Sequence, residues 1–237
     1  MLVGCFAPTS QALAEPLKLL FLGNSLTFSN DLPAVVRALG KVDGVAIKTR
    51  TIANPNAALE DHWRSSRTQR LVAEGNWDYV VMQQGPSSLA KNQRNLRDWS
   101  VRWSEAIRAA GAQPAMYMVW PSARHFRSFD AVGESYANAA VAADAKLLPA
   151  GRAWLEAWRL DPGLKLYGRD GFHPSPMGTL LAAIVIYAGV TGGAPETLPA
   201  RIKVGERSVR ISEATEKVLL AAVAELMVPA ERVDGSQ

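Results

Sequence analysis

Two short segments far apart in the sequence hold the residue types that acyl-transfer chemistry needs. Near the start, FLGNSLTF places Ser25 directly after a glycine and an asparagine. Late in the chain, DGFHP places Asp170 three residues before His173, with a glycine between them that allows a tight bend. A serine hydroxyl becomes a nucleophile when a neighbouring base takes its proton and a third group orients that base. The spacing allows the Asp170 carboxylate to fold back onto the imidazole Nδ1, which leaves Nε2 free to face a serine.

Each segment also has a purely structural explanation. Ser25 could cap a helix that follows a strand, as serines in that position often do. Asp170 could cap a turn with His173 packed over it, because Asp-x-x-His alone is a weak pattern. The presence of a Gly-x-Ser after an apolar run in the same chain favours the functional interpretation.

The elements that would position these residues alternate between β and α character. Five short runs, three of them almost continuously apolar, are expected to be strands: 18–22, 45–52, 79–83, 114–120 and 146–149. Stretches with helical period are expected at 32–39, 58–73, 96–110, 131–143, 153–158, 176–190 and 212–226. This alternation predicts the α/β class, with a parallel sheet covered by helices on both faces in a three-layer α/β/α sandwich.

No linker rich in Pro, Gly or Ser divides the chain. The stretch 195–210 is expected to be a loop with a short hairpin, and 180–190 a buried helix too short to cross a bilayer. We therefore expect one domain over 17–237, preceded by a leader or signal remnant at 1–16.

In open parallel sheets, ligands bind beyond the carboxyl ends of the strands. Polar motifs follow the first four predicted strands: GNS at 23–25, NPN at 54–56, QQG at 83–85 and WPS at 120–122. The sequence therefore predicts that these motifs meet at one edge of the sheet.

Two of these segments resemble sequence blocks of a known family. FLGNSLTFSNDLP is similar to the first block of the SGNH, or GDSL-type, hydrolases, with Asn24 where Asp is commoner. DGFHPSPMGTLLAA resembles their last block, and the resemblance extends from residue 19 to about residue 183 with the blocks in the family's order. It implies a flavodoxin-like sheet, with Ser25 as the nucleophile, His173 as general base and then acid, and Asp170 as the carboxylate that orients it.

The two middle blocks depart from the family pattern. The second block usually supplies a glycine N–H to the oxyanion, but ANPNAALEDHW has no glycine. Asn56 is the best positional match and Asn54 the second, since Asn tolerates the left-handed backbone conformation. MQQGPSS replaces the usual Gly-x-Asn-Asp and resembles the Gln-Gly-x-Ser form of some carbohydrate-esterase relatives.

Gln84 could donate its side-chain amide in the third block, with Gln83 and Ser87 as rivals. The glutamines could instead only cap the end of a strand. The oxyanion donors implied are therefore the Ser25 N–H, the Asn56 N–H and the Gln84 amide.

The function implied is a serine esterase that works through an acyl-enzyme and needs no metal or cofactor. The third block suggests an O-acetyl group on a carbohydrate as the substrate, and a short-chain lipid ester or thioester is the nearest alternative. A carbohydrate-binding or scaffold protein that has lost efficient turnover is the alternative from another class.

Composition and charge fit a globular protein with a small-molecule or carbohydrate partner. The 26 basic and 22 acidic residues are interspersed, which argues against nucleic-acid binding. The densest basic stretch, 91–108, has helical spacing and is expected to be a solvated helix face. The sequence does not indicate an oligomeric state.

The N-terminal segment suggests an exported protein. Cys5 is the only cysteine, which excludes an intramolecular disulfide, and LVGC resembles the end of a bacterial lipoprotein signal, so a lipid anchor at Cys5 is one prediction. The ALA at 12–14 has the pattern of a signal-peptidase site and is the alternative. A periplasmic or lipid-anchored location is expected, with a cytoplasmic one as the alternative.

Three further residues have weaker functional interpretations. His62, with Glu60 and Asp61, could suggest metal ligands, but consecutive positions on a helix do not face one another, so a packing role at a helix surface or half-buried is expected. His125 is expected in an exposed loop on the ligand side. Trp120 could stack on a sugar ring, although a buried position is the stronger expectation.

Overall fold

A computed structural model describes residues 15–227, and its sheet confirms the predicted α/β class. The parallel strands are β1 (Leu17–Gly23), β2 (Ile47–Ala53), β3 (Tyr79–Met82), β4 (Gln113–Tyr117) and β5 (Lys146–Leu148). They lie in the order β2-β1-β3-β4-β5, which is the flavodoxin-like order. Each of the five overlaps one of the runs that were expected to be strands.

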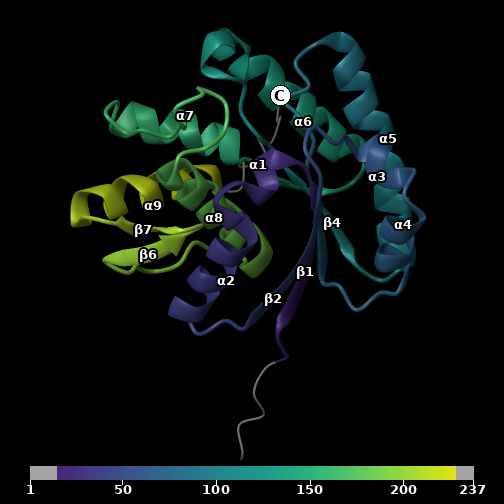
Figure 1. Cartoon of the computed structure of the whole chain (residues 1–237), viewed down its shortest axis with the longest axis horizontal. Coiled ribbons are helices and arrows are strands. Elements are labelled where there is room, and N and C mark those ends of the chain that lie inside the picture. The colour runs from purple at the N-terminus through teal and green to yellow at the C-terminus, as the bar shows by residue number, and fades with distance from the viewer. Residues whose placement is uncertain (1–14, 228–237) are drawn as a thin grey trace, which may run out of the picture.

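Helices cover both faces of this sheet, which makes the fold a three-layer α/β/α sandwich (Figure 1). The α-helices are α1 (Ser25–Phe28), α2 (Leu32–Val42), α3 (Leu59–Trp63), α4 (Ser66–Ala73), α5 (Ala90–Ala109), α6 (Phe129–Ala142), α7 (Ala150–Leu160), α8 (Pro176–Thr191) and α9 (Glu213–Met227). The 3-10 turns are η1 (Ser29–Asp31) and η2 (Ala123–Ser128), and an antiparallel hairpin joins β6 (Arg201–Val204) to β7 (Arg207–Arg210). Helices α2, α8 and α9 lie on one side of the sheet, and α3, α4 and α5 lie on the other.

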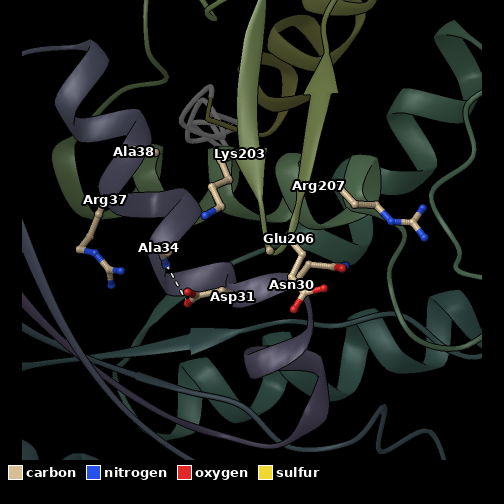
Figure 2. A pocket seen from close by; sticks show the side chains of 9 residues that line it. Asn30, Asp31, Ala34, Arg37, Ala38, Lys203, Glu206 and Arg207 are labelled. Carbon is tan, nitrogen blue, oxygen red and sulfur yellow. Dashed lines mark hydrogen bonds between the residues drawn. The ribbon is translucent and has the colours of Figure 1, made fainter.

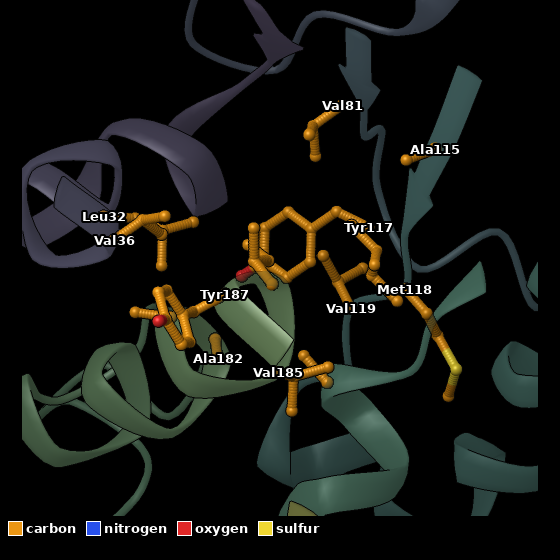
Figure 3. Packing of buried hydrophobic residues seen from close by; sticks show 14 of the residues in the cluster. Leu32, Val36, Val81, Ala115, Tyr117, Met118, Val119, Ala182, Val185 and Tyr187 are labelled. Carbon is orange, nitrogen blue, oxygen red and sulfur yellow. The ribbon is translucent and has the colours of Figure 1, made fainter. Parts of the chain in front are cut away.

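The core lies between the sheet and these two helix layers. Tyr117 of β4 projects toward α2 and α8, where Leu32, Val36, Ala182 and Val185 meet it (Figure 3). Helix α8 is buried along residues 178–190, as predicted for 180–190 from its unbroken apolar sequence. The two buried layers hold the strand ends, and thus the loops that follow them, in fixed positions.

Two helix predictions need correction. The stretch 58–73 is two helices, not one, because Ser65 has an extended backbone and its side chain caps α4 by accepting from the Thr68 N–H at 3.3 Å. Helix α5 begins at Ala90, six residues before the predicted start at 96, because its first turns, AKNQRN, are polar and carry no apolar period.

The predicted leader lies mostly outside the described residues. Cys5 and the 12–14 motif fall there, so the boundary at 16–17, the lipid anchor and the exported location stay predictions. Within residues 15–227, none of the helices combines the length and the apolar character that crossing a bilayer requires.

Candidate active site

The loop after β1 presents Ser25 at the carboxyl edge of the sheet. The strand ends at Gly23, and Asn24 caps α1 by accepting from the Leu26 N–H at 3.0 Å. Ser25 is therefore the first residue of α1. A Cβ on Gly23 would lie 2.2 Å from Thr27 Oγ1, so only glycine fits this strand-to-helix turn.

Hydrogen bonds among buried polar side chains stabilise this turn. The Gln83 Oε1 accepts from the Asn24 N–H at 3.0 Å and from Thr27 Oγ1 at 2.8 Å, while its Nε2 donates to Asn24 Oδ1 at 3.0 Å. The Asn24 Nδ2 donates in turn to the Ala57 carbonyl at 3.1 Å, which an aspartate could not do. The side-chain amide of Gln83, the alternative candidate for the oxyanion role, is thus hydrogen-bonded to the turn that carries Ser25.

His62 supports the same turn, in a way the sequence did not reveal. Its side chain is buried, and Nε2 lies 2.8 Å from the Gly23 carbonyl oxygen. A carbonyl can only accept, so Nε2 carries the proton. Burial lowers the pKa of His62 below its ordinary value, because desolvation disfavours the charged imidazolium. His62 is thus buried more deeply than the half-buried position predicted for it, because its ring makes a hydrogen bond to the residue two positions before Ser25.

The loop before α8 brings His173 to the serine. The His173 Nε2 lies 2.9 Å from Ser25 Oγ, and its Nδ1 lies 2.5 Å from Asp170 Oδ2. The other carboxylate oxygen, Oδ1, accepts from the N–H groups of Phe172 and His173, each at 3.0 Å. The hydrogen bond with the imidazole, and next the one from the Phe172 N–H, lower the pKa of Asp170. Gly171, at φ 68°, makes the bend that this arrangement requires.

Two distant side chains fix the histidine loop, and the sequence signalled neither role. The Asn30 Nδ2 donates to the Pro174 carbonyl at 3.0 Å and to Thr179 Oγ1 at 2.9 Å, across 144 positions for the first bond. The Trp120 Nε1 donates to the Phe172 carbonyl at 3.0 Å. Trp120 is fully buried, and its ring stacks on that of Trp154 with the ring centroids 3.6 Å apart. It is therefore not available to stack on a sugar.

The second predicted block contributes Asn56 to the pocket beside Ser25. Asn56 has φ 59°, the left-handed conformation expected for it, and lines the pocket. Asn54 is exposed, and its N–H donates to the Gly23 carbonyl at 3.2 Å. Of the two asparagines, Asn56 is therefore the one that lines the same pocket as Ser25.

The third block contributes Gln84 and Ser87. Both line the pocket and both are buried. The Gln84 Nε2 donates to Ser87 Oγ at 3.0 Å and approaches Asn95 Oδ1 at 3.4 Å. The pocket has a volume of about 280 Å³. Amide and hydroxyl side chains dominate its wall: Asn24, Asn56, Gln84, Ser87, Asn92 and Asn95, with Phe172 as the aromatic member.

A larger cleft of about 810 Å³ lies between α2 and the tip of the β6–β7 hairpin, and Ser25 and His173 do not line it. Figure 2 shows Lys203 and Glu206 on the hairpin side of this cleft, and Asp31 of η1 on the other side with its carboxylate turned toward the Ala34 N–H. A Cβ on Gly205, at the hairpin tip, would lie 3.0 Å from Asn30 Cα. The hairpin tip thus packs against Asn30, the residue whose side chain binds the histidine loop.

The remaining predicted residues lie away from the pocket. His125 is exposed in η2 and lies 2.9 Å from Ser122 Oγ. The basic side chains of 91–108 are exposed on α5, as expected for a solvated helix face. Among residues 15–227, the His, Cys, Asp and Glu side chains form no group of three suited to a metal ion.

Comparisons with known proteins point to one family. No protein-family model matches the sequence, and no curated protein matches it. A solved structure from Slackia heliotrinireducens, assigned to the SGNH hydrolases, is 30% identical with a TM-score of 0.64, over 74% of this chain and 99% of that one. A DUF4886 family protein from Bacteroides uniformis is 18% identical with a TM-score of 0.70, over 91% and 96% of the two chains.

The fold is also similar to that of an esterase. A variant of an acetyl xylan esterase from Geobacillus stearothermophilus is 14% identical with a TM-score of 0.53, over 73% of this chain and 92% of that one. At identities below a fifth, this likeness and that to the Bacteroides protein concern the fold alone.

Proposed function

Because the chain belongs to the SGNH, or GDSL-type, hydrolase family, we propose that it is a serine esterase with Ser25 as nucleophile. His173 is the general base and then the general acid, and Asp170 orients it. The observation that carries this proposal is the pair of contacts made by one imidazole, 2.9 Å from Nε2 to Ser25 Oγ and 2.5 Å from Nδ1 to Asp170 Oδ2. An imidazole held in this way has its free nitrogen aimed at the hydroxyl whose proton it must take.

The reaction would proceed in two halves. Ser25 Oγ bonds to the ester carbonyl carbon while its proton moves to His173 Nε2, which gives a tetrahedral oxyanion. The bond to the leaving alcohol then breaks, and the alcohol oxygen takes the proton from Nε2. Water repeats these steps on the acyl-enzyme, releases the acid and returns the proton to Ser25.

Three donors would hold the oxyanion. The Ser25 N–H belongs to the first turn of α1, where N–H groups have no carbonyl partner within the helix. The backbone N–H of Asn56, in its left-handed conformation, and the side-chain amide of Gln84 would supply the others, since both residues line the same pocket as Ser25. Loss of one such donor lowers kcat by about 10²- to 10³-fold in serine hydrolases.

The size and polarity of the pocket support a small acyl group on a polar alcohol. A volume of about 280 Å³ falls just below the usual range for ligand pockets, about 300–1,000 Å³. The amides of Asn56 and Asn92 and the ring of Phe172 suit sugar hydroxyls and a sugar face. We propose an O-acetylated carbohydrate as the substrate class, which agrees with the acetyl xylan esterase among the proteins of similar fold.

A second candidate follows from one observation. Both N–H groups of the Gln84 amide already have neighbours that accept, Ser87 Oγ and Asn95 Oδ1. If the amide cannot release either of them, the site would bind a carbohydrate ester without turning it over efficiently.

Hydrolysis of a series of aryl esters separates these candidates. The esterase predicts turnover of aryl acetate that declines as the acyl chain lengthens, and turnover that disappears in Ser25→Ala. Acetylated polysaccharides then test the leaving group. A preference for longer acyl chains would favour a lipid ester or thioester, and saturable binding without turnover would favour the binding protein.

A further inference from the structure

The orientation of the Gln84 amide is fixed by its neighbours. Its Oε1 accepts from the Leu59 N–H at 3.1 Å, and this donor lies just after the loop that carries Asn56. Its Nε2 faces Ser87 Oγ at 3.0 Å and Asn95 Oδ1 at 3.4 Å. Gln84 is buried, with only 4% of its surface exposed.

Both neighbours of Nε2 are compelled to act as acceptors. The only proton of the Ser87 hydroxyl is donated to the Gly85 carbonyl at 2.9 Å, so its oxygen can only accept from Gln84. The Asn95 Nδ2 donates to Glu60 Oε2 at 3.0 Å, which turns its Oδ1 toward Gln84. An ionised carboxylate offers no donor, so Glu60 sets the direction of this chain of hydrogen bonds.

Arg64 is the last member of this series of hydrogen bonds and lies at the surface. Its guanidinium pairs with Glu60 Oε1 at 2.5 Å, one turn along the helical segment that contains α3. The carboxylate is thus held between Arg64 on one side and Asn95 of α5 on the other. The chain runs from an exposed ion pair to the wall of the reaction pocket.

We propose that Glu60 and Asn95 are positioning residues that keep the Gln84 amide turned with its N–H groups toward the oxyanion. This inference rests on the proposed esterase function. A flipped amide would present Oε1 and repel the developing charge. The contact with Asn95, at 3.4 Å, is the longest of the three that the amide makes, so the N–H that points to Asn95 can also donate to an oxyanion beside it while all three contacts keep the amide plane in place.

The primary test replaces Glu60 by a group of the same shape that can also donate. In Glu60→Gln, the residue at 60 can turn its NH₂ toward Asn95. The hydrogen bonds from residue 60 through Asn95 to Gln84 then no longer have a fixed donor-to-acceptor direction. We expect kcat on aryl acetate to fall by about fivefold with KM unchanged within about twofold, because the amide acts on the transition state. Asn95→Ala should lower kcat by a similar factor and serves if Glu60→Gln folds poorly.

The chain offers a closely matched control. Glu156 pairs with Arg159 on α7 at 2.7 Å, and the side chains are 28% and 63% exposed, against 30% and 70% for Glu60 and Arg64. Glu156→Gln removes the same kind of surface ion pair far from Gln84. It should leave kcat and KM as in the wild-type protein.

A double variant separates positioning from general structural support. If Glu60 acts through the amide, Glu60→Gln should lower kcat no further in a Gln84→Ala background. The inference is overturned if the two losses multiply, or if Glu60→Gln retains the kcat of Glu156→Gln. The rate of labelling by a fluorophosphonate gives the same comparison without a substrate.

The two proposals fail in different ways. If the wild-type protein neither turns over aryl acetate nor reacts with the fluorophosphonate, the esterase proposal fails and the positioning role falls with it. If the wild-type protein is active and Glu60→Gln is indistinguishable from it, the positioning role alone is overturned.

Discussion

The serine and the histidine of the candidate site are held in opposite ways. The turn that carries Ser25 rests on buried groups, Asn24, Gln83 and His62, each at most 5% exposed. The loop that carries His173 lies near the surface, where the side chains of His173 and Asp170 are 39% and 51% exposed.

The two regions also differ in what supports them. The serine turn is stabilised by side chains within the sheet edge, packed too tightly to admit a methyl group at Gly23. The histidine loop depends on hydrogen bonds from Asn30 and Trp120 to its backbone carbonyls. The difference suggests that changes at the serine turn should affect folding, whereas changes in the histidine loop should affect the reaction more than stability.

The largest expected effect is on activity, in the histidine loop. His173→Ala should lower kcat by about 10⁴-fold or more, because the base and acid of both half-reactions is lost. The thermal midpoint should change little, since the side chain is partly exposed. Ester hydrolysis and thermal unfolding measured on the same preparation check both parts. Loss of the folded state in this variant would contradict the proposed difference between the serine turn and the histidine loop.

The next effect is on stability, at the serine turn. In Gly23→Ala, the new Cβ would lie 2.2 Å from Thr27 Oγ1 and 2.6 Å from Gln83 Oε1. We expect the free energy of unfolding to fall by about 1–3 kcal/mol, as for other overpacked interiors. Denaturant titration measures this change.

Gly193→Ala is the control for that variant. An added Cβ there meets no heavy atom of the described residues within 4 Å. Its free energy of unfolding should stay within about 0.5 kcal/mol of wild type. Equal stability losses in the two variants would contradict the account of the serine turn.

Asn30 links the two regions, so its loss should affect both activity and stability to a smaller degree. Asn30→Ala removes the bonds to Pro174 and Thr179, and we expect about 1 kcal/mol of lost stability and about a tenfold lower kcat. Asn76→Ala is the matched control, because Asn76 also has a left-handed backbone, at φ 64° against 53°, but an exposed side chain. If the two variants have the same kcat, Asn30 does not position the histidine loop.

The smallest effect concerns acid stability. The pKa of Asp170 is lowered below its ordinary value of 3.8, first by the bond with His173 and next by the Phe172 N–H. The ionised carboxylate therefore stabilises the folded state above that ordinary value, and this contribution is lost as the pH falls through the lowered pKa. Exposure keeps the contribution small.

Thermal midpoints of wild type and Asp170→Asn at two pH values test this directly. Wild type should be slightly more stable at pH 7, and the difference should vanish in acid well below pH 3.8. A difference that persists unchanged in acid would mean that the ionised carboxylate is not its source.

The fold could be predicted from the sequence because the three central strands, β1, β3 and β4, are almost continuously apolar and all five strands alternate with stretches of helical period. All five strand predictions are confirmed, and so is the buried helix at 180–190. The break at Ser65 was missed because a single capping serine is a weak signal within a long helical pattern. The start of α5 was missed because its polar first turns pack little against the core.

The roles of the supporting side chains could not be predicted, because they depend on partners distant in the sequence. His62 and Gly23 are 39 positions apart, and Asn30 and Pro174 are 144 apart. Gln83 and Gln84 are consecutive at the end of β3, so their side chains leave the chain in opposite directions. Which of them faces the pocket depends on the course of the backbone at the strand end.

Reaction of the protein with a fluorophosphonate, followed by peptide mapping, tests whether Ser25 is the nucleophile that His173 activates. We expect a single phosphonyl adduct on Ser25, lost in Ser25→Ala and formed about 100-fold more slowly in His173→Ala. A folded wild-type protein that stays unlabelled, or an adduct on another serine, would contradict it.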